Sequence, residues 1–114
     1  MKKIKIVDQD FYRQAGPRKM YGWVRILGED NSSFSFKSIY RWPCNYDEKR
    51  YLDAIYGGVL TAFREIGKEP FGNFQVLEVN FSQDDEANVP FAYREAAKRA
   101  TNKIIQEWID SLER

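Results

Sequence analysis

The sequence contains no histidine and a single cysteine, Cys44. Histidine is the commonest general base and transition-metal ligand, so its absence excludes a Ser-His or Cys-His nucleophile and almost excludes a structural zinc site. One cysteine cannot form an internal disulfide, which is typical of proteins in a reducing compartment. Because no histidine is available to activate the thiol, Cys44 is expected to be unreactive.

The sequence also lacks segments that would direct the chain to a membrane or a nucleotide. No run approaches the roughly 18 apolar residues of a membrane span. The start, MKKIKIVDQD, has no apolar stretch after its lysines, so no signal peptide is expected. No G-x-x-x-x-G-K-[ST] pattern is present to hold phosphates. We therefore expect a cytoplasmic protein that binds no nucleotide, metal or other cofactor.

The residues that are present suffice for one folded domain, residues 1–114. Apolar residues make up 43% of the chain and aromatic residues 16%, which allows a packed core. The net charge is only +1, but residues 1–25 carry +5 and residues 26–114 carry −4. A polyanion would thus be attracted to the N-terminal fifth alone. The alternative is that these lysines protect an edge strand from aggregation.

Four segments have the composition of β-strands. Residues 4–7, 20–27 and 34–42 are rich in β-branched and aromatic side chains, and the turn cluster 28–33 separates the last two. This spacing predicts an antiparallel hairpin of 20–27 with 34–42. Residues 75–81 alternate between apolar and polar side chains, which predicts a half-exposed strand. Its inner face is expected to hold Leu77, Val79 and Phe81.

The first helix has clear signals at both ends. Asn45 is expected to be its N-cap, with Glu48 completing a capping box, and Gly67 the left-handed residue after its last turn. Gly57 and Gly58 lie inside the helix, where each costs about 1 kcal/mol relative to alanine. This cost favours close packing against another backbone, and a local kink is the alternative. The apolar stripe consists of Tyr51, Leu52, Ile55, Val59, Ala62, Phe63 and Ile66.

A second helix is predicted over residues 91–112, with Pro90 near its start and Phe91 on its inner side. The polar, acidic stretch 82–90 precedes it as a loop. The order of elements is therefore β-β-β-α-β-α. It predicts an α/β two-layer (α+β) domain, with a four-stranded mixed sheet and two helices on one face.

Five segments of this chain, in order, resemble domain IV of the translocase elongation factor G. Residues 12–26, YRQAGPRKMYGWVRI, are similar to the family's R-Q-x-G-G-R-x-x-Y-G-x-V-x-I segment. FSF at 34–36 resembles its F-x-F strand, and YLDAIYGGVLTAF at 51–63 its Y-I-x-A-V-x-x-G-I-x-x-A helix. GNFQVLEVNF at 72–81 and FAYREAAKRATNKII at 91–105 resemble its G-F-x-V-x-D-V-x-V strand and its M-A-F-K-x-A-A-x-x-A-x-x-x-A helix.

The resemblance implies a ribosomal protein S5 domain 2-like fold with a left-handed β-α-β crossover. In the family this domain lies at the tip of the factor, and two of its loops enter the ribosomal decoding centre beside tRNA and mRNA. Those loops correspond here to about residues 13–21 and 82–90. By this resemblance the expected partners are the ribosome or structured RNA.

The chain departs from the family pattern in both loops. The second loop is about three residues shorter than in the family and lacks its histidine and its D-S-S segment. Asp84, Asp85 and Glu86 stand there instead, and carboxylates repel the phosphates that RNA-binding proteins neutralise with Lys and Arg. In the first loop Pro17 replaces the second glycine of the family's pair. Without a G-x-x-x-x-G-K-[ST] pattern, no GTPase domain is expected within these 114 residues, and nucleotide-driven translocation is not expected of them by themselves.

Two interpretations of the first loop stay open. In one, Arg13, Arg18 and Lys19 contact phosphates while Tyr21 or Tyr12 stacks on a base. In the other, the loop folds onto the acidic one, and Arg18 or Lys19 pairs with its carboxylates. Such exposed pairs are worth about 0–1 kcal/mol each.

No set of residues in the sequence has the pattern of an active site, so we expect a binding module and not an enzyme. The leading hypothesis is contact with RNA or the ribosome through the basic first loop. The alternative is a protein-interaction or inhibitory module that reuses the fold and binds no RNA. Its contact surface would be the acidic loop 82–88, with Asp84, Asp85 and Glu86. These residues do not follow the D-x-[DN]-x-[DN]-G calcium pattern, so no metal site is expected.

An aromatic and basic cluster lies between the third strand and the first helix. It can serve as a stacking platform, but Trp42-Pro43 at a strand end favours a role in capping the core. The cluster consists of Tyr40, Arg41, Trp42, Tyr46, Arg50 and Tyr51.

Overall fold

The computed structural model describes residues 3–43 and 45–112, so Cys44 lies outside the described residues. The order β-β-β-α-β-α is confirmed, with one turn of 3-10 helix added before the last helix. The elements are β1 (Ile4–Ala15), β2 (Arg18–Glu29), β3 (Phe34–Ser38), α1 (Glu48–Glu65), β4 (Gly72–Asn80), η1 (Asp85–Ala87) and α2 (Pro90–Leu112).

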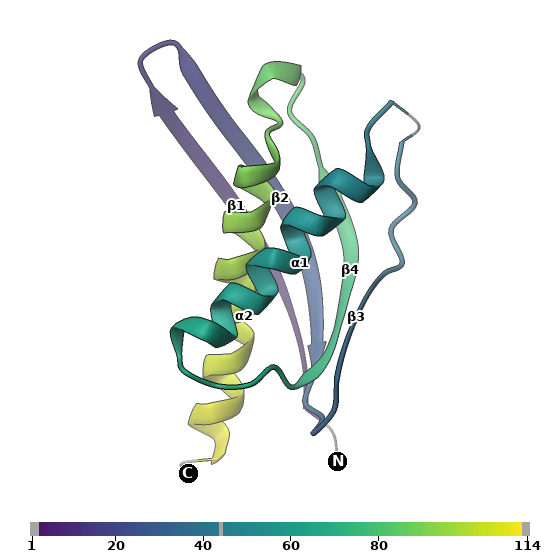
Figure 1. Cartoon of the computed structure of the whole chain (residues 1–114), viewed down its shortest axis with the longest axis vertical. Helices are drawn as coiled ribbons and strands as arrows, with labels where there is room; N and C mark the ends of the chain where they lie inside the picture. The colour runs from purple at the N-terminus through teal and green to yellow at the C-terminus, as the bar shows by residue number, and fades with distance from the viewer. Residues whose placement is uncertain (1–2, 44, 113–114) are drawn as a thin grey trace.

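The four strands form one mixed sheet in the order β1-β2-β4-β3. The pairs β1–β2 and β2–β4 are antiparallel, whereas β3 runs parallel to β4. Figure 1 shows both helices on one face of this sheet. Seen from that face, the chain rises along β3, descends through α1 and rises again along β4, to the left of β3. This crossover is left-handed, as the resemblance to domain IV of elongation factor G implies. Most β-α-β crossovers are right-handed.

The predicted hairpin of 20–27 with 34–42 is wrong, because β4 lies between β2 and β3. The hairpin is instead formed by β1 and β2, which pair from Ile4↔Glu29 to Ala15↔Arg18. The first strand is predicted to end at residue 7 because the residues that follow it are mostly polar. In the structure these residues continue β1, and only Val7 and Phe11 of the strand are buried.

A β-bulge explains why the inner face of β4 differs from the prediction. Arg25 of β2 is opposite Glu78, but the next residue of β2 is opposite Val76, so Leu77 is the extra residue. The alternation therefore shifts at this point. Phe74, Val76 and Val79 are buried, while Leu77 is only half-buried.

Helix α1 begins later than its sequence signals suggest, because its N-cap is Asp47 and not Asn45. The Asp47 carboxylate accepts a hydrogen bond from the Arg50 backbone N–H at 3.3 Å. At the other end Gly67 has φ +68°, as predicted for the left-handed residue. Gly58 lies against the backbone of α2, which confirms close packing of the two helices.

Helix α2 packs against β1, β2 and α1. Ala92 and Tyr93 are fully buried, whereas Phe91 is 44% exposed and so does not belong to the inner side as predicted. Phe91 lies at the first turn, where its ring and that of Phe11 form a T-shaped pair with centroids 5.9 Å apart. In the described part of the chain no helix is both long and apolar enough to cross a membrane.

Candidate functional site

The first candidate loop is mostly a two-stranded ribbon. Strand pairing continues to Ala15↔Arg18, so only Gly16 and Pro17 are unpaired. Gly16 has φ +61°, and proline is fixed near φ −65°, which together fit a two-residue turn of type II′. Residues 13–21, called the basic tip from here on, therefore form a pre-ordered projection that extends past the start of α2 (Figure 1).

The four predicted contact residues of the basic tip are divided between the two faces of the ribbon. Gly22 faces α2, and side chains alternate along a strand, so Arg18 and Met20 also point to the helix side of the sheet. Arg13 is paired with Met20 and therefore points to the same side. Lys19 and Tyr21 point to the opposite face of the sheet, the one away from both helices, which is called the open face from here on. The three basic side chains are exposed.

Tyr21 lies opposite Tyr12 on the open face of the ribbon. Tyr12 is 56% exposed and its hydroxyl donates to the Gln14 side chain at 3.0 Å, whereas Tyr21 is half-buried. Desolvation by burial raises the pKa of the Tyr21 hydroxyl, and the negative charge of Asp10 raises it further. Tyr12 therefore offers more free ring surface for stacking than Tyr21 does.

The second candidate loop, residues 82–88, called the acidic loop from here on, is closed by Asn88. The Ser82 backbone N–H donates to Asn88 Oδ1 at 2.7 Å, and Asn88 Nδ2 donates to the Ser82 carbonyl at 2.9 Å. Asn88 is only 4% exposed, and its own carbonyl accepts a hydrogen bond from the Tyr51 hydroxyl. The loop is thus fastened at both ends by one buried amide.

Two of the three carboxylates in the acidic loop have local structural partners. Asp84 is the N-cap of η1 and accepts from the Glu86 backbone N–H at 3.2 Å. Asp85 accepts from the Tyr46 hydroxyl at 3.2 Å. All three carboxylate residues remain exposed. The loop therefore presents its negative charges on a turn that hydrogen bonds hold in place, and not on a loose polar segment.

The basic tip and the acidic loop lie side by side at one end of the molecule (Figure 1). Together they line a cavity of about 270 Å³. In the described part of the chain, neither Arg18 nor Lys19 forms an ion pair with a carboxylate, so the predicted pairing across the two segments is not observed. Both signs of charge are thus available to a partner at this end. The lining residues are Pro17, Arg18, Lys19, Met20, Asp84, Glu86, Ala87 and Val89.

The rings of the aromatic and basic cluster between β3 and α1 pack within or against the core. Trp42 stacks on Tyr51 with ring centroids 6.2 Å apart, and Tyr46 stacks on Phe81 at 3.7 Å. Burial raises the pKa values of the Tyr51 and Tyr93 hydroxyls, so both stay protonated and donate to backbone carbonyls. These rings are used for packing, which favours the core-capping interpretation over a stacking platform.

Sequence reasoning missed Asn88 and Tyr93 as the residues that shape this end. Helical spacing does not distinguish Tyr93 from other positions of α2, although its hydroxyl donates to the Asn80 carbonyl at 2.7 Å. Composition does not distinguish Asn88 from the other polar residues of the loop. Spacing and composition therefore identify neither residue, because their partners are groups that come together only after folding.

Comparisons with known proteins identify the fold but not a family. No protein-family model and no curated protein matches the chain. A crystal structure of a protein from Thermus thermophilus is similar over 89% of this chain, with a TM-score of 0.72 and 21% sequence identity. The match spans only 15% of that protein's length. At this identity the likeness concerns the fold alone.

Proposed function

We propose that this chain is a non-catalytic binding module of the kind formed by domain IV of elongation factor G. It contacts structured RNA or the ribosome through the basic tip. The resemblance of five segments in order supports the relationship, and the observed fold and crossover are those that the resemblance implies. The relative from Thermus thermophilus is consistent with this, since there a domain of this fold is a small part of a much longer chain.

The observation that carries the proposal is the unneutralised charge of the basic tip. Arg13, Arg18 and Lys19 are exposed, and in the described residues none of them has an ion-pair partner. Because the ribbon is paired up to its two-residue turn, it can bring these cations to a phosphate backbone with little further ordering of the chain at binding. Because binding then releases counterions, its affinity should fall steeply with salt.

A titration against ribosomes and a structured RNA hairpin at about 50 and 200 mM salt tests this proposal. Arg18→Ala and Lys19→Ala should each weaken binding and lower the slope of log affinity against log salt by about 1. Lys68→Ala, which removes the same charge from the opposite end of the molecule, is the matched control and should have little effect. Undetectable binding at the lower salt would overturn the proposal.

The exposed carboxylates of the acidic loop favour a second candidate function, that of a protein-interaction or inhibitory module that binds no RNA. Asp84, Asp85 and Glu86 are exposed on a short helical turn that neighbouring side chains hold in place by hydrogen bonds. Glu86→Gln separates the two functions, because this carboxylate makes no side-chain hydrogen bond or ion pair in the described part of the chain. It should strengthen RNA binding if the basic tip binds RNA, since a repulsive charge is removed. It should weaken capture of a basic protein partner if the acidic loop is the contact surface.

A further inference from the structure

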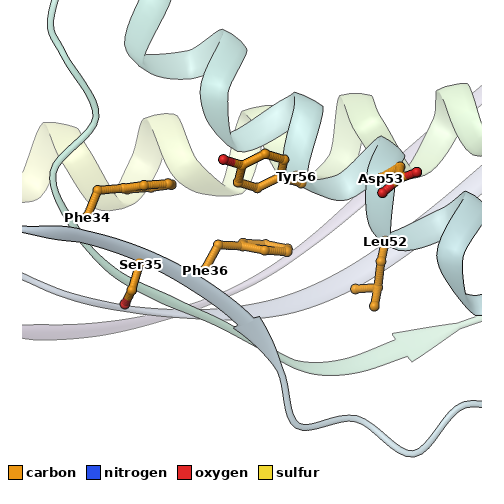
Figure 2. A pocket seen from close by; sticks show the side chains of 6 residues that line it. All are labelled: Phe34, Ser35, Phe36, Leu52, Asp53 and Tyr56. Atoms are coloured by element: carbon orange, nitrogen blue, oxygen red, sulfur yellow. The ribbon is translucent and has the colours of Figure 1, made fainter.

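An apolar groove lies between β3 and α1, and it shares no lining residue with the cavity between the basic tip and the acidic loop. Figure 2 shows Phe34 and Phe36 rising from β3 toward α1, with Tyr56 above them and Leu52 and Asp53 at one end. The cavity measures about 450 Å³. Phe36 and Tyr56 have ring centroids 5.0 Å apart, and Tyr56 is 39% exposed. The groove thus has an aromatic floor and wall that are open to solvent.

The groove runs along an unpaired sheet edge. Strand β3 is the last in the sheet and has β4 as its only neighbour among the described strands. Ser33 accepts from the Gly72 N–H at 3.0 Å, and the Ile39 N–H donates to Val76 at 3.0 Å, so odd-numbered residues face β4. Because backbone direction alternates along a strand, the even-numbered residues of β3 turn their N–H and C=O groups to the open edge. The phenylalanines whose side chains line the groove therefore also offer free backbone groups beside it.

We propose that an extended peptide segment of a partner protein binds here as a fifth strand next to β3. Its backbone pairs with Phe34 and Phe36, and its alternate aliphatic side chains enter the groove beneath Tyr56. Asp53 is exposed at the rim and has no ion pair in the described residues, so the segment carries a lysine or arginine at that end. This site is independent of the proposed RNA contact.

A peptide suits this edge better than a second copy of the chain does. In an antiparallel pairing of β3 with β3 of another copy, the side chains brought to the groove would again be Phe34 and Phe36. Both are already packed against the core of their own molecule. A self-paired dimer would therefore leave the groove unfilled, whereas a free segment can supply the missing aliphatic groups.

Binding of short blocked peptides, followed by NMR on the labelled full chain, tests the proposal. The probe alternates valine with threonine and ends on lysine at its last groove-facing position. We expect saturable binding, with shifts and slowed amide exchange at Phe34 and Phe36. A second probe with N-methylated valines keeps the side chains but loses the backbone bonds, so it should not bind.

Charge reversal distinguishes the site from non-specific contact. Asp53→Lys should weaken the lysine peptide by about fivefold to tenfold and favour a matched glutamate peptide instead. Glu69→Lys makes the same change of net charge outside the groove and should leave both affinities unchanged. The proposal is overturned if shifts map elsewhere or if the N-methylated probe binds equally well. It is also overturned if Phe36 is already protected in a dimer formed without peptide.

Discussion

Asn88 holds Ser82 by both of its backbone groups. Its side-chain oxygen accepts from the Ser82 N–H at 2.7 Å, and its nitrogen donates to the Ser82 carbonyl at 2.9 Å. Beyond the end of β4, the N–H and carbonyl of Ser82 have no partner strand, and part-buried backbone groups need hydrogen-bond partners. The Asn88 amide supplies both. The acidic loop can then turn back toward α2 without leaving these groups unsatisfied.

Replacing Asn88 with alanine should lower the free energy of unfolding by about 2 to 3 kcal/mol. Both hydrogen bonds to Ser82 are lost, together with the longer ones to the Tyr46 and Tyr93 hydroxyls at 3.4 and 3.5 Å. The N–H and carbonyl of Ser82 then remain part-buried without their partner. Urea denaturation measures the effect. Asn45→Ala removes an exposed amide and should cost less than about 0.5 kcal/mol. Equal losses for the two variants would show that Asn88 does not hold the loop.

The N-cap of α1 can be tested by a second pair of substitutions. Asp47→Ala should cost about 1 kcal/mol, because its carboxylate satisfies the N–H of Arg50 and lies at the positive end of the helix. Asn45, the residue that the capping-box pattern predicts, should be replaceable by alanine with almost no change. Thermal unfolding followed by circular dichroism would compare the two. A larger loss for Asn45→Ala would restore the sequence-based assignment.

The sequence predicts the class of the fold because hydrophobic periodicity reports which elements exist and which face each buries. Both helices and their order follow from spacing alone. Pairing of strands does not, because Phe34–Ser38 fits equally well beside β2 or β4 by its pattern. The inner face of β4 also escapes prediction, since the bulge at Leu77 shifts the alternation that the pattern assumes.

The two segments of the candidate site can be identified from sequence, but their internal structure cannot. Polar residues beyond Val7 do not indicate a strand by hydrophobicity, so the pattern describes the ribbon that carries Arg13 and Arg18 as a loop. The role of Asn88 depends on groups that meet only after folding. Long-range partners of this kind leave no periodic trace in the sequence.

The ion pair between Asp8 and Arg25, on the open face of the sheet, predicts that the stability of the fold depends on pH. Arg25 Nε lies 2.7 Å from Asp8, and this hydrogen bond lowers the pKa of the Asp8 carboxyl below its usual value of 3.8. Because the folded-state pKa is depressed, the stabilisation is present above the unfolded pKa and is lost as pH falls through the folded pKa.

Carbon-detected NMR titration of Asp8 would check this prediction. In Arg25→Gln the midpoint should move up toward 3.8, since the guanidinium group that donates to Asp8 and its positive charge are both removed. Lys37→Gln removes a cation from the far edge of the same face and serves as the control. A midpoint for Asp8 that is insensitive to Arg25→Gln would contradict the assignment of the shift to this pair.

Two neighbouring glycines of α1 should respond in opposite ways to the same substitution. A Cβ at Gly58 would clash with the Arg94 carbonyl oxygen and lie 3.0 Å from the Lys98 nitrogen, both of them backbone atoms of α2. Gly58→Ala should therefore separate the helices and cost about 2 to 3 kcal/mol in urea denaturation. At Gly57 the nearest atom is the flexible Arg94 Nε at 3.9 Å, so Gly57→Ala should stabilise by up to about 1 kcal/mol through helix propensity. Stabilisation by both substitutions would mean that α1 and α2 do not cross at Gly58.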